Sequence, residues 1–93
     1  MATISGQTTV PSSGTAVPLG DALVNAALMV KALEGNTGMV ALGNDGANDV
    51  TLTNGLRLSA GECVVFDYCS ALSALYLDAE VNGEGVSWII LFA

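Results

Sequence analysis

The sequence predicts an all-β protein: a small antiparallel β-sandwich of roughly six to eight short strands with an extended N-terminal arm. Three observations indicate this fold. Short apolar stretches rich in strand formers are separated by turn residues about every ten positions. Residues 75–81 alternate apolar and polar side chains without interruption. Two Asn-Gly dipeptides, which favour two-residue hairpin turns, stand at 54–55 and 82–83.

The N-terminal segment differs from the rest of the chain, and we divide the 93 residues into an arm at 1–13 and a sandwich domain at 14–93. The arm is small, polar and uncharged, and it ends at a Pro-Ser-Ser-Gly breaker. It is either a frayed terminus or a segment that orders against a neighbouring chain or shell by adding to an exposed sheet edge. The strand formers that would make this contact are Thr3, Ile4, Thr8, Thr9 and Val10.

Residues 22–34 are open to two interpretations. They are rich in helix formers, with Asp21 available as the N-cap and Gly35 as the terminator, so propensity alone favours a helix. In the alternative, residues 20–25 form a loop and residues 27–34 form a strand that returns as residues 39–42 through the turn at 35–38. Neighbouring strands routinely override helix propensity.

The middle of the chain predicts a second hairpin and a further strand. Residues 50–53 and 56–58 flank Asn54-Gly55 and are expected to pair. Residues 59–62 then turn into a strand at 63–68. If residues 62–69 are one straight strand, Cys63 and Cys69 share a face about 20 Å apart, beyond disulfide reach. We expect two reduced, buried thiols, although a bend at Tyr68 would change this.

The alternation in residues 75–81 puts four apolar side chains on one face and three polar ones on the other. The apolar set is Leu75, Leu77, Ala79 and Val81, and the polar set is Tyr76, Asp78 and Glu80. The turn Asn82-Gly83 predicts antiparallel pairing with the strand at 86–92.

The C-terminal strand at 86–92 is apolar on both faces. Trp88 shares a face with Val86, Ile90 and Phe92 and is expected in the core. Ile89 and Leu91 lie on the opposite face, which is normally wet in a two-layer sandwich, so we expect an intermolecular contact there.

Composition excludes several classes of function. Two basic residues stand against nine acidic ones, giving a net charge of -7, which excludes a nucleic-acid partner. The absence of histidine removes His-based triads and most zinc sites, and we expect no enzyme activity, metal or cofactor. The loop at 44–49 offers oxygen ligands but lacks the terminal glutamate of an EF-hand, so a plain turn is expected.

Two further expectations concern location and assembly. No uncharged apolar run approaches the ~18–20 residues that cross a bilayer, and residues 1–6 lack the start of a signal peptide. We therefore expect no membrane partner and a protein made and used without export. The chain has one lysine and two prolines, Pro11 and Pro18, so the sheet edges are left without their usual protection, which favours a homo-oligomer.

The order of motifs resembles the small β-sandwich virion proteins of tailed bacteriophages. The motifs are Asn36-Thr37-Gly38 before a strand, residues 54–62 as NG-x-x-L-x-x-GE, residues 72–76 as L-x-x-L-Y, and residues 86–88 as V-S-W. The resemblance covers residues 27–90 and implies a strand at 27–34 and a capsid decoration (cement) role. It also implies a homotrimer bound to a major capsid protein on the virion surface, assembled in the host cytoplasm. The two cysteines and the alanine-rich residues 22–32 depart from it.

Two functions from different classes stay open. The first is a structural virion protein that bridges shell subunits and so stabilises the shell by linkage. The second is an adhesin or carbohydrate-binding module, whose site would have to come from Tyr68, Tyr76, Trp88, Asp67, Asp78 and Glu80. An enzyme is disfavoured because Asp78 and Glu80 are more simply the solvated face of a strand. A small-molecule substrate is likewise not expected.

Overall fold

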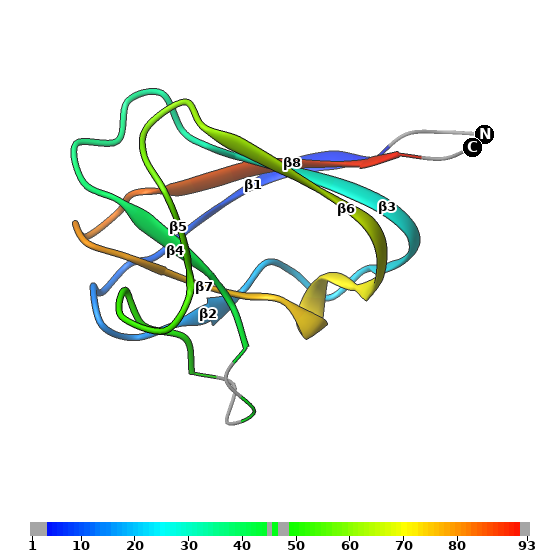
Figure 1. The fold of residues 1–93 in the computed structure, drawn as a ribbon, viewed down its shortest axis with the longest axis horizontal. Coiled ribbons are helices and arrows are strands. Elements are labelled where there is room, and N and C mark those ends of the chain that lie inside the picture. The colour runs from blue at the N-terminus through cyan, green and yellow to red at the C-terminus, as the bar shows by residue number, and fades with distance from the viewer. Residues whose placement is uncertain (1–3, 45, 47–48, 92–93) are drawn as a thin grey trace.

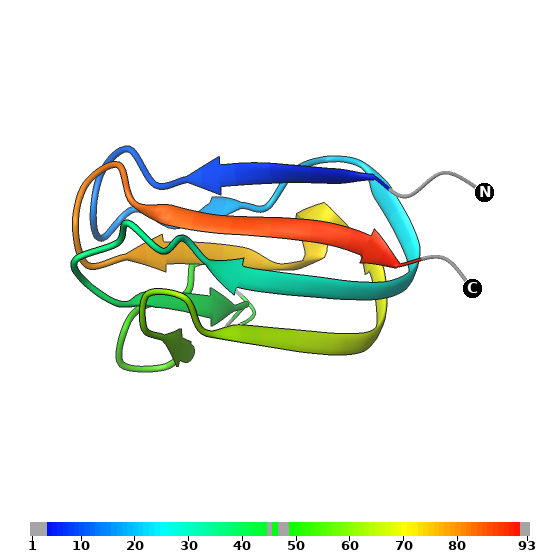
Figure 2. The ribbon, with the colours of Figure 1, turned by 90° about the horizontal axis from the view of Figure 1, so that it is seen from above.

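The computed structural model describes residues 4–44, 46 and 49–91, and these residues form two antiparallel sheets packed face to face (Figures 1 and 2). Sheet A contains β1 (Ser5–Thr9), β8 (Gly85–Leu91), β3 (Leu23–Ala32) and β6 (Cys63–Ala71), in that order. Sheet B contains β2 (Val17–Pro18), β7 (Tyr76–Ala79), β4 (Val40–Gly43) and β5 (Leu56–Leu58), in that order. The predicted all-β sandwich is confirmed.

Helix is confined to one short 3-10 turn, η1 (Leu72–Ala74), within the described residues. None of the helical structure in that part of the chain has the length and apolar character needed to span a membrane.

The core lies between the two sheets and is built from their inward-facing aliphatic side chains. Leu28 and Val30 of β3 and Ile90 of β8 are fully buried on the sheet A side. Val40 of β4 and Leu77 of β7 are fully buried on the sheet B side. Burial of such side chains away from water is the main stabilising contribution to a domain of this size.

The N-terminal segment is part of the sandwich, so the predicted boundary at residue 13 is wrong. β1 pairs with β8 along its whole length, from Ser5 opposite Ile89 to Thr9 opposite Gly85 (Figure 2). Val10 is fully buried in the core, and its backbone N–H donates to the carbonyl of Glu84 at 2.9 Å. The strand formers do add to an exposed sheet edge, but that edge belongs to their own chain.

Residues 23–32 form a strand, as the resemblance implied and against their helix propensity. β3 lies inside sheet A, where it pairs with β8 on one side and with β6 on the other. Two ladders of interstrand hydrogen bonds outweigh a helix preference of a few tenths of a kcal/mol per residue, roughly. The strand begins at Leu23, four residues earlier than the expected start at residue 27, and Asn25 has a φ of 46° near an irregularity in the pairing with β6.

The turn at Asn82-Gly83 does not form the predicted hairpin. It connects β7 in sheet B to β8 in sheet A, so these two strands do not pair with each other. Gly83 does adopt the positive φ expected of this dipeptide, at 83°. The predicted turn at Asn82-Gly83 is therefore confirmed, but it joins strands of the two different sheets.

The turn at Asn54-Gly55 is also not a hairpin, because residues 50–53 are not a strand. The backbone N–H of Gly55 donates to the carbonyl of Thr51 at 3.0 Å, and β5 pairs with β4 instead. A Cβ atom at Gly55 would lie 2.5 Å from Cγ2 of Val50 and 3.0 Å from Cβ of Ala41. Glycine is needed here for close packing.

β7 buries both of its faces, contrary to the predicted division into apolar and polar sides. Leu77 and Ala79 are in the core, as expected, but Asp78 is also buried, with 3% of its surface exposed. The loop before β2 covers Asp78. Oδ1 of Asp78 accepts hydrogen bonds from the backbone N–H groups of Gly14 at 3.0 Å and Ala79 at 2.8 Å. Val81, expected inside, is 38% exposed.

An irregularity in β6 separates the two cysteines. Ala26 pairs with Cys69 and Leu28 pairs with Phe66, so β6 has one extra residue between these pairs, which is a β-bulge. The bulge reverses the alternation at residues 67–68. Both thiols are free, as expected, but Cys69 is half-buried against the core while Cys63 is exposed on the other face. The prediction that both are buried on one face is wrong.

Candidate interaction surface

A row of apolar side chains crosses the outer face of sheet A. Ile89 of β8 lies opposite Met29 of β3, and Met29 lies opposite Val65 of β6. Opposite residues in neighbouring antiparallel strands share a face, and these three alternate with residues that contact the core. Val65 is 50% exposed. We call Ile89, Met29 and Val65 the outer row.

The positions beside the outer row add little charge. On one side Leu91, which is 38% exposed, lies opposite Ala27. On the other side Ser87 lies opposite Lys31. Within the four described strands of sheet A, Lys31 and Asp67 are the charged residues. A protein with a net charge of -7 therefore keeps most of its charge away from this face.

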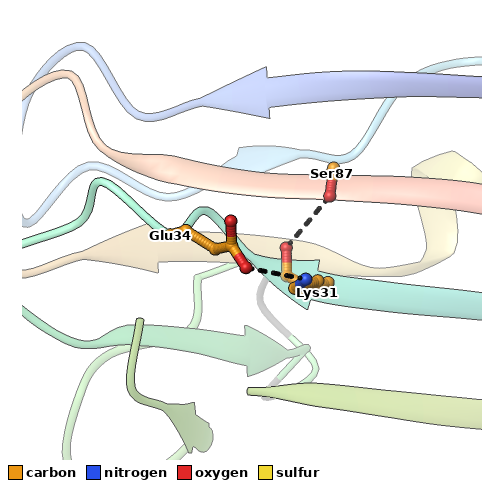
Figure 3. Close-up of polar contacts among 3 residues, drawn as sticks. All are labelled: Lys31, Glu34 and Ser87. Atoms are coloured by element: carbon orange, nitrogen blue, oxygen red, sulfur yellow. Dashed lines mark hydrogen bonds and ion pairs between the residues drawn. The ribbon is translucent and has the colours of Figure 1, made fainter. Parts of the chain in front are cut away.

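Lys31 is held at the border of the outer face by local contacts (Figure 3). Its Nζ lies 3.2 Å from Oε2 of Glu34 in an exposed ion pair, and its backbone carbonyl accepts a hydrogen bond from Oγ of Ser87 at 3.5 Å. An exposed pair of this kind contributes little to stability. Its effect here is to neutralise the one cation of the sheet A strands.

A shallow groove runs along the outer face next to the outer row. Its volume is about 350 Å³, and small or flexible side chains of β1, β8 and β3 form its walls. The residues that line it include Ser5, Gln7, Met29, Lys31, Ser87 and Ile89. An apolar side chain from another protein would find an apolar floor there with polar groups at the border.

Only some of the residues predicted to make intermolecular contacts are accessible at the surface. Ile4 is 46% exposed, Thr9 is exposed, and Ile89 and Leu91 lie on the outer face of sheet A. Val10 is fully buried, so its predicted contact role is wrong.

Two other predicted contact residues have different outcomes. The Thr8 hydroxyl is used within the chain, because it donates to the carbonyl of Leu19 and accepts from Nε1 of Trp88 at 3.1 Å. Thr3 lies outside the described residues.

The aromatic residues considered for a carbohydrate site are not brought together. Tyr68 is 64% exposed on β6, and its hydroxyl donates to Oδ1 of Asn25 at 3.1 Å. Trp88 of β8 packs against the core, as predicted, and lies over Gly6 of β1. Tyr76 belongs to sheet B. Phe92, which was expected on the same strand face as Trp88, lies outside the described residues.

The carboxylates considered with these aromatics have structural contacts. Asp78 is buried and hydrogen-bonded, and Oε1 of Glu80 accepts from the backbone N–H of Met39 at 3.0 Å. Asp67 is exposed beside Tyr68 on β6.

No cluster of three or more His, Cys, Asp or Glu side chains with metal-binding geometry occurs in residues 4–44, 46 and 49–91. The loop at 44–49 that was considered for calcium lies partly outside the described residues, because positions 45, 47 and 48 are not described.

Glu84 fastens the turn at residues 36–38 to the start of β8, a role that the sequence did not indicate. Its carboxylate accepts hydrogen bonds from the backbone N–H of Gly38 at 3.0 Å and of Thr37 at 2.7 Å, and from the Thr37 hydroxyl at 2.9 Å. The backbone N–H groups of Gly38 and Thr37 lower the pKa of Glu84 below its ordinary value of 4.5. The ionised form of Glu84 therefore stabilises this turn.

No family model matches the chain, and no curated protein matches it either. The resemblance to phage virion proteins therefore rests on the motifs in the sequence.

Sequence reasoning found Ile89 and Leu91 but missed Met29 and Val65 as members of the same face. The signal was present, because residues 27–32 and 63–66 are apolar at almost every position and not only at alternate ones. A strand of that kind needs cover on both faces.

Proposed function

We propose that this protein is a non-enzymatic structural component of a phage virion, which decorates the capsid and stabilises it by bridging shell subunits. The observation that carries the proposal is the outer face of sheet A. There, the exposed Val65 and the half-buried Met29 and Ile89 form the outer row, with almost no charge around it. Exposed apolar patches rimmed by polar residues mark surfaces that bind other proteins.

The mechanism is thermodynamic. A protein that binds the assembled shell and not its separated subunits lowers the free energy of the assembled state, by an amount set by its concentration and affinity. The contact is mainly apolar and backbone-polar, so it needs no catalytic group, metal or cofactor. The net charge of -7 keeps the free surface from binding DNA or an anionic membrane.

The partner in this proposal is a major capsid protein, and the place of action is the outer surface of the virion. The exposed carboxylates lie mostly in loops and turns, such as those at residues 34, 49, 62 and 80. They leave the outer row free to face the shell while the loops face solvent.

The first prediction tests the docking face directly with Met29→Lys, which places a charge in the centre of the outer row. Apolar contacts lose affinity steeply when a charge must be desolvated, so we expect at least a tenfold weaker attachment to capsids, about 1.4 kcal/mol or more. The measurement is co-sedimentation of the purified protein with particles that lack it.

The matched control is Leu56→Lys, which charges an apolar residue that is 49% exposed on β5 of the other sheet. Its attachment should equal that of the unmodified protein. If both variants attach equally well, the outer face of sheet A does not contact the capsid, which would contradict the proposal.

The alternative function is an adhesin or carbohydrate-binding module of a tail or head fibre. The one observation that favours it is the exposed pair Asp67 and Tyr68 on β6, which offers an aromatic ring beside a carboxylate. Specific binding of the protein to a glycan array, abolished by Tyr68→Ala, would support this alternative over the capsid role.

A further inference from the structure

β6 is an edge strand whose first half, residues 63–66, lacks the charges, prolines and bulges that usually protect an edge from pairing with another chain. It pairs with β3 on one side only, and β5 on the same side of the molecule belongs to the other sheet. Its nine residues, Cys63–Ala71, contain no lysine and no proline. Val65 and Tyr68 are 50% and 64% exposed. Such an edge presents a row of unpaired backbone donors and acceptors.

The opposite edge of sheet A is a weaker candidate. β1 has five residues, and Pro11 follows it closely. Proline removes a backbone donor and prevents a pairing strand from extending further. β6 is therefore the edge of sheet A that offers the longer template.

The β-bulge limits which part of β6 can pair. Its extra residue falls at 67–68, where the strand bends and the side-chain alternation reverses. From Cys63 to Phe66 the register with β3 is unbroken, and the alternation of exposed and half-buried side chains continues to Asp67. The stretch from Cys63 to Asp67 is therefore the part of β6 that can accept a partner strand.

We propose that β6 pairs with β6 of a second copy of this chain, antiparallel about a two-fold axis at Val65. The two four-stranded A sheets would then become one continuous sheet of eight strands. A two-fold contact uses the same surface on both copies, so each favourable contact away from the axis is made twice.

The arrangement of charge selects this register. With the axis at Val65, Asp67 of each copy lies opposite Cys63 of the other and in the same cross-strand row as its Lys31. With the axis at Asp67, two carboxylates would lie directly opposite each other, which is destabilising. The favoured register thus keeps the two Asp67 carboxylates apart and places each in the row of the Lys31–Glu34 ion pair of the other copy.

The same register also extends the apolar surface. Val65 of one copy meets Val65 of the other, so the outer row would run from Ile89 through Met29 of one copy to Met29 and Ile89 of the second. Cross-strand β-branched pairs of this kind stabilise sheets by a few tenths of a kcal/mol to about 1 kcal/mol. This inference concerns contact between copies and does not require the capsid role.

The first test is the mass of the purified protein by size-exclusion chromatography with light scattering. We expect a dimer of twice 9.4 kDa at concentrations of tens of micromolar, roughly. Val65→Lys would place two like charges opposite each other at the axis and should give a monomer that keeps its far-UV circular dichroism spectrum. Met29→Lys changes the same row one strand further in and should remain a dimer.

The second test fixes the register by crosslinking. In a background where both native cysteines are replaced by serine, Val65→Cys should form a covalent dimer with oxidised glutathione, because opposite Cα atoms of antiparallel strands lie about 4.5–5.5 Å apart, within the range that disulfides span. Met29→Cys in the same background should stay uncrosslinked.

Three results would overturn the proposal. These are a monomer of 9.4 kDa for the unmodified protein, the trimer that the resemblance implies, or a dimer that Met29→Lys disrupts and Val65→Lys does not. The capsid role is tested independently, because Met29→Lys is expected to weaken shell attachment at least tenfold while leaving the dimer intact.

Discussion

At the residue scale, Asp78 and Glu84 make structural hydrogen bonds that could not be predicted from their residue types. Asp78 sits in a regular alternation that predicts an exposed carboxylate, yet the loop at residues 12–15 covers it and uses its Oδ1 as an acceptor. Glu84 looks like a turn residue but accepts three hydrogen bonds from Thr37 and Gly38. Both roles depend on segments distant in sequence, so neither could be predicted from local pattern.

Gly55 provides a residue-scale prediction. Gly55→Ala should destabilise the fold by about 1–3 kcal/mol, because the new Cβ would overlap Val50 and press on Ala41. Chemical unfolding would measure the change. Gly35→Ala is the control, since nothing lies within 4 Å of a Cβ at Gly35 and its φ is not positive; its effect should stay within about 0.5 kcal/mol. Equal effects of the two substitutions would contradict the close packing at Gly55.

Glu84 gives the pH dependence of stability. Because its pKa is lowered in the folded state, its contribution is fully present above the ordinary value of 4.5 and is lost as pH falls through the lower folded value. The difference in unfolding free energy between the unmodified protein and Glu84→Gln should therefore shrink as the pH is lowered below 4.5. Urea titrations from pH 7 to about 3 would show this. The exposed Asp21→Asn serves as control, and a Glu84→Gln difference that is the same at every pH would contradict the contribution of the ionised carboxylate.

At the element scale, the existence of strands was more predictable than their partners. The alternation in residues 75–81 correctly indicated β7, and both Asn-Gly dipeptides correctly indicated turns. A turn sequence specifies only the local backbone, however, and in a sandwich consecutive strands often belong to different layers. For that reason the turn at 82–83 joins sheet B to sheet A, and the turn at 54–55 precedes β5 without joining it to a preceding partner strand.

β3 shows why local propensity misleads in a segment of this kind. Its alanine-rich sequence favours a helix, but as a strand it takes an interior position of sheet A, where residues such as Leu28 gain partners on both sides and a buried face. The alternative of a strand at residues 27–34, which the sequence left open, is the one that the structure confirms.

The central position of β3 predicts a large effect of truncating its buried face. Leu28→Ala should lower the unfolding free energy by about 2–5 kcal/mol, because Leu28 is fully buried and a cavity remains. Leu23→Ala, at the start of the same strand where the side chain is 74% exposed, should change it by less than about 0.5 kcal/mol. Denaturant unfolding of both variants would check this, and similar losses at the two positions would contradict the central role of β3.

At the scale of the whole molecule, the chain places apolar side chains on the outer face of sheet A as well as in the core between the sheets. The sequence indicated this outer surface through Ile89 and Leu91, and the register of sheet A completes it with Met29 and Val65. The groove beside the outer row and the open edge at β6 could not be predicted, because both depend on strand order, which no single segment encodes.

Cryo-electron microscopy of the particle that contains this protein tests the central claim most directly. We expect sandwich density on the outer surface of the capsid, with the outer face of sheet A against the shell and the loop at residues 80–84 toward solvent. Density confined to the tail tip, or capsid density in which sheet A faces solvent, would contradict it.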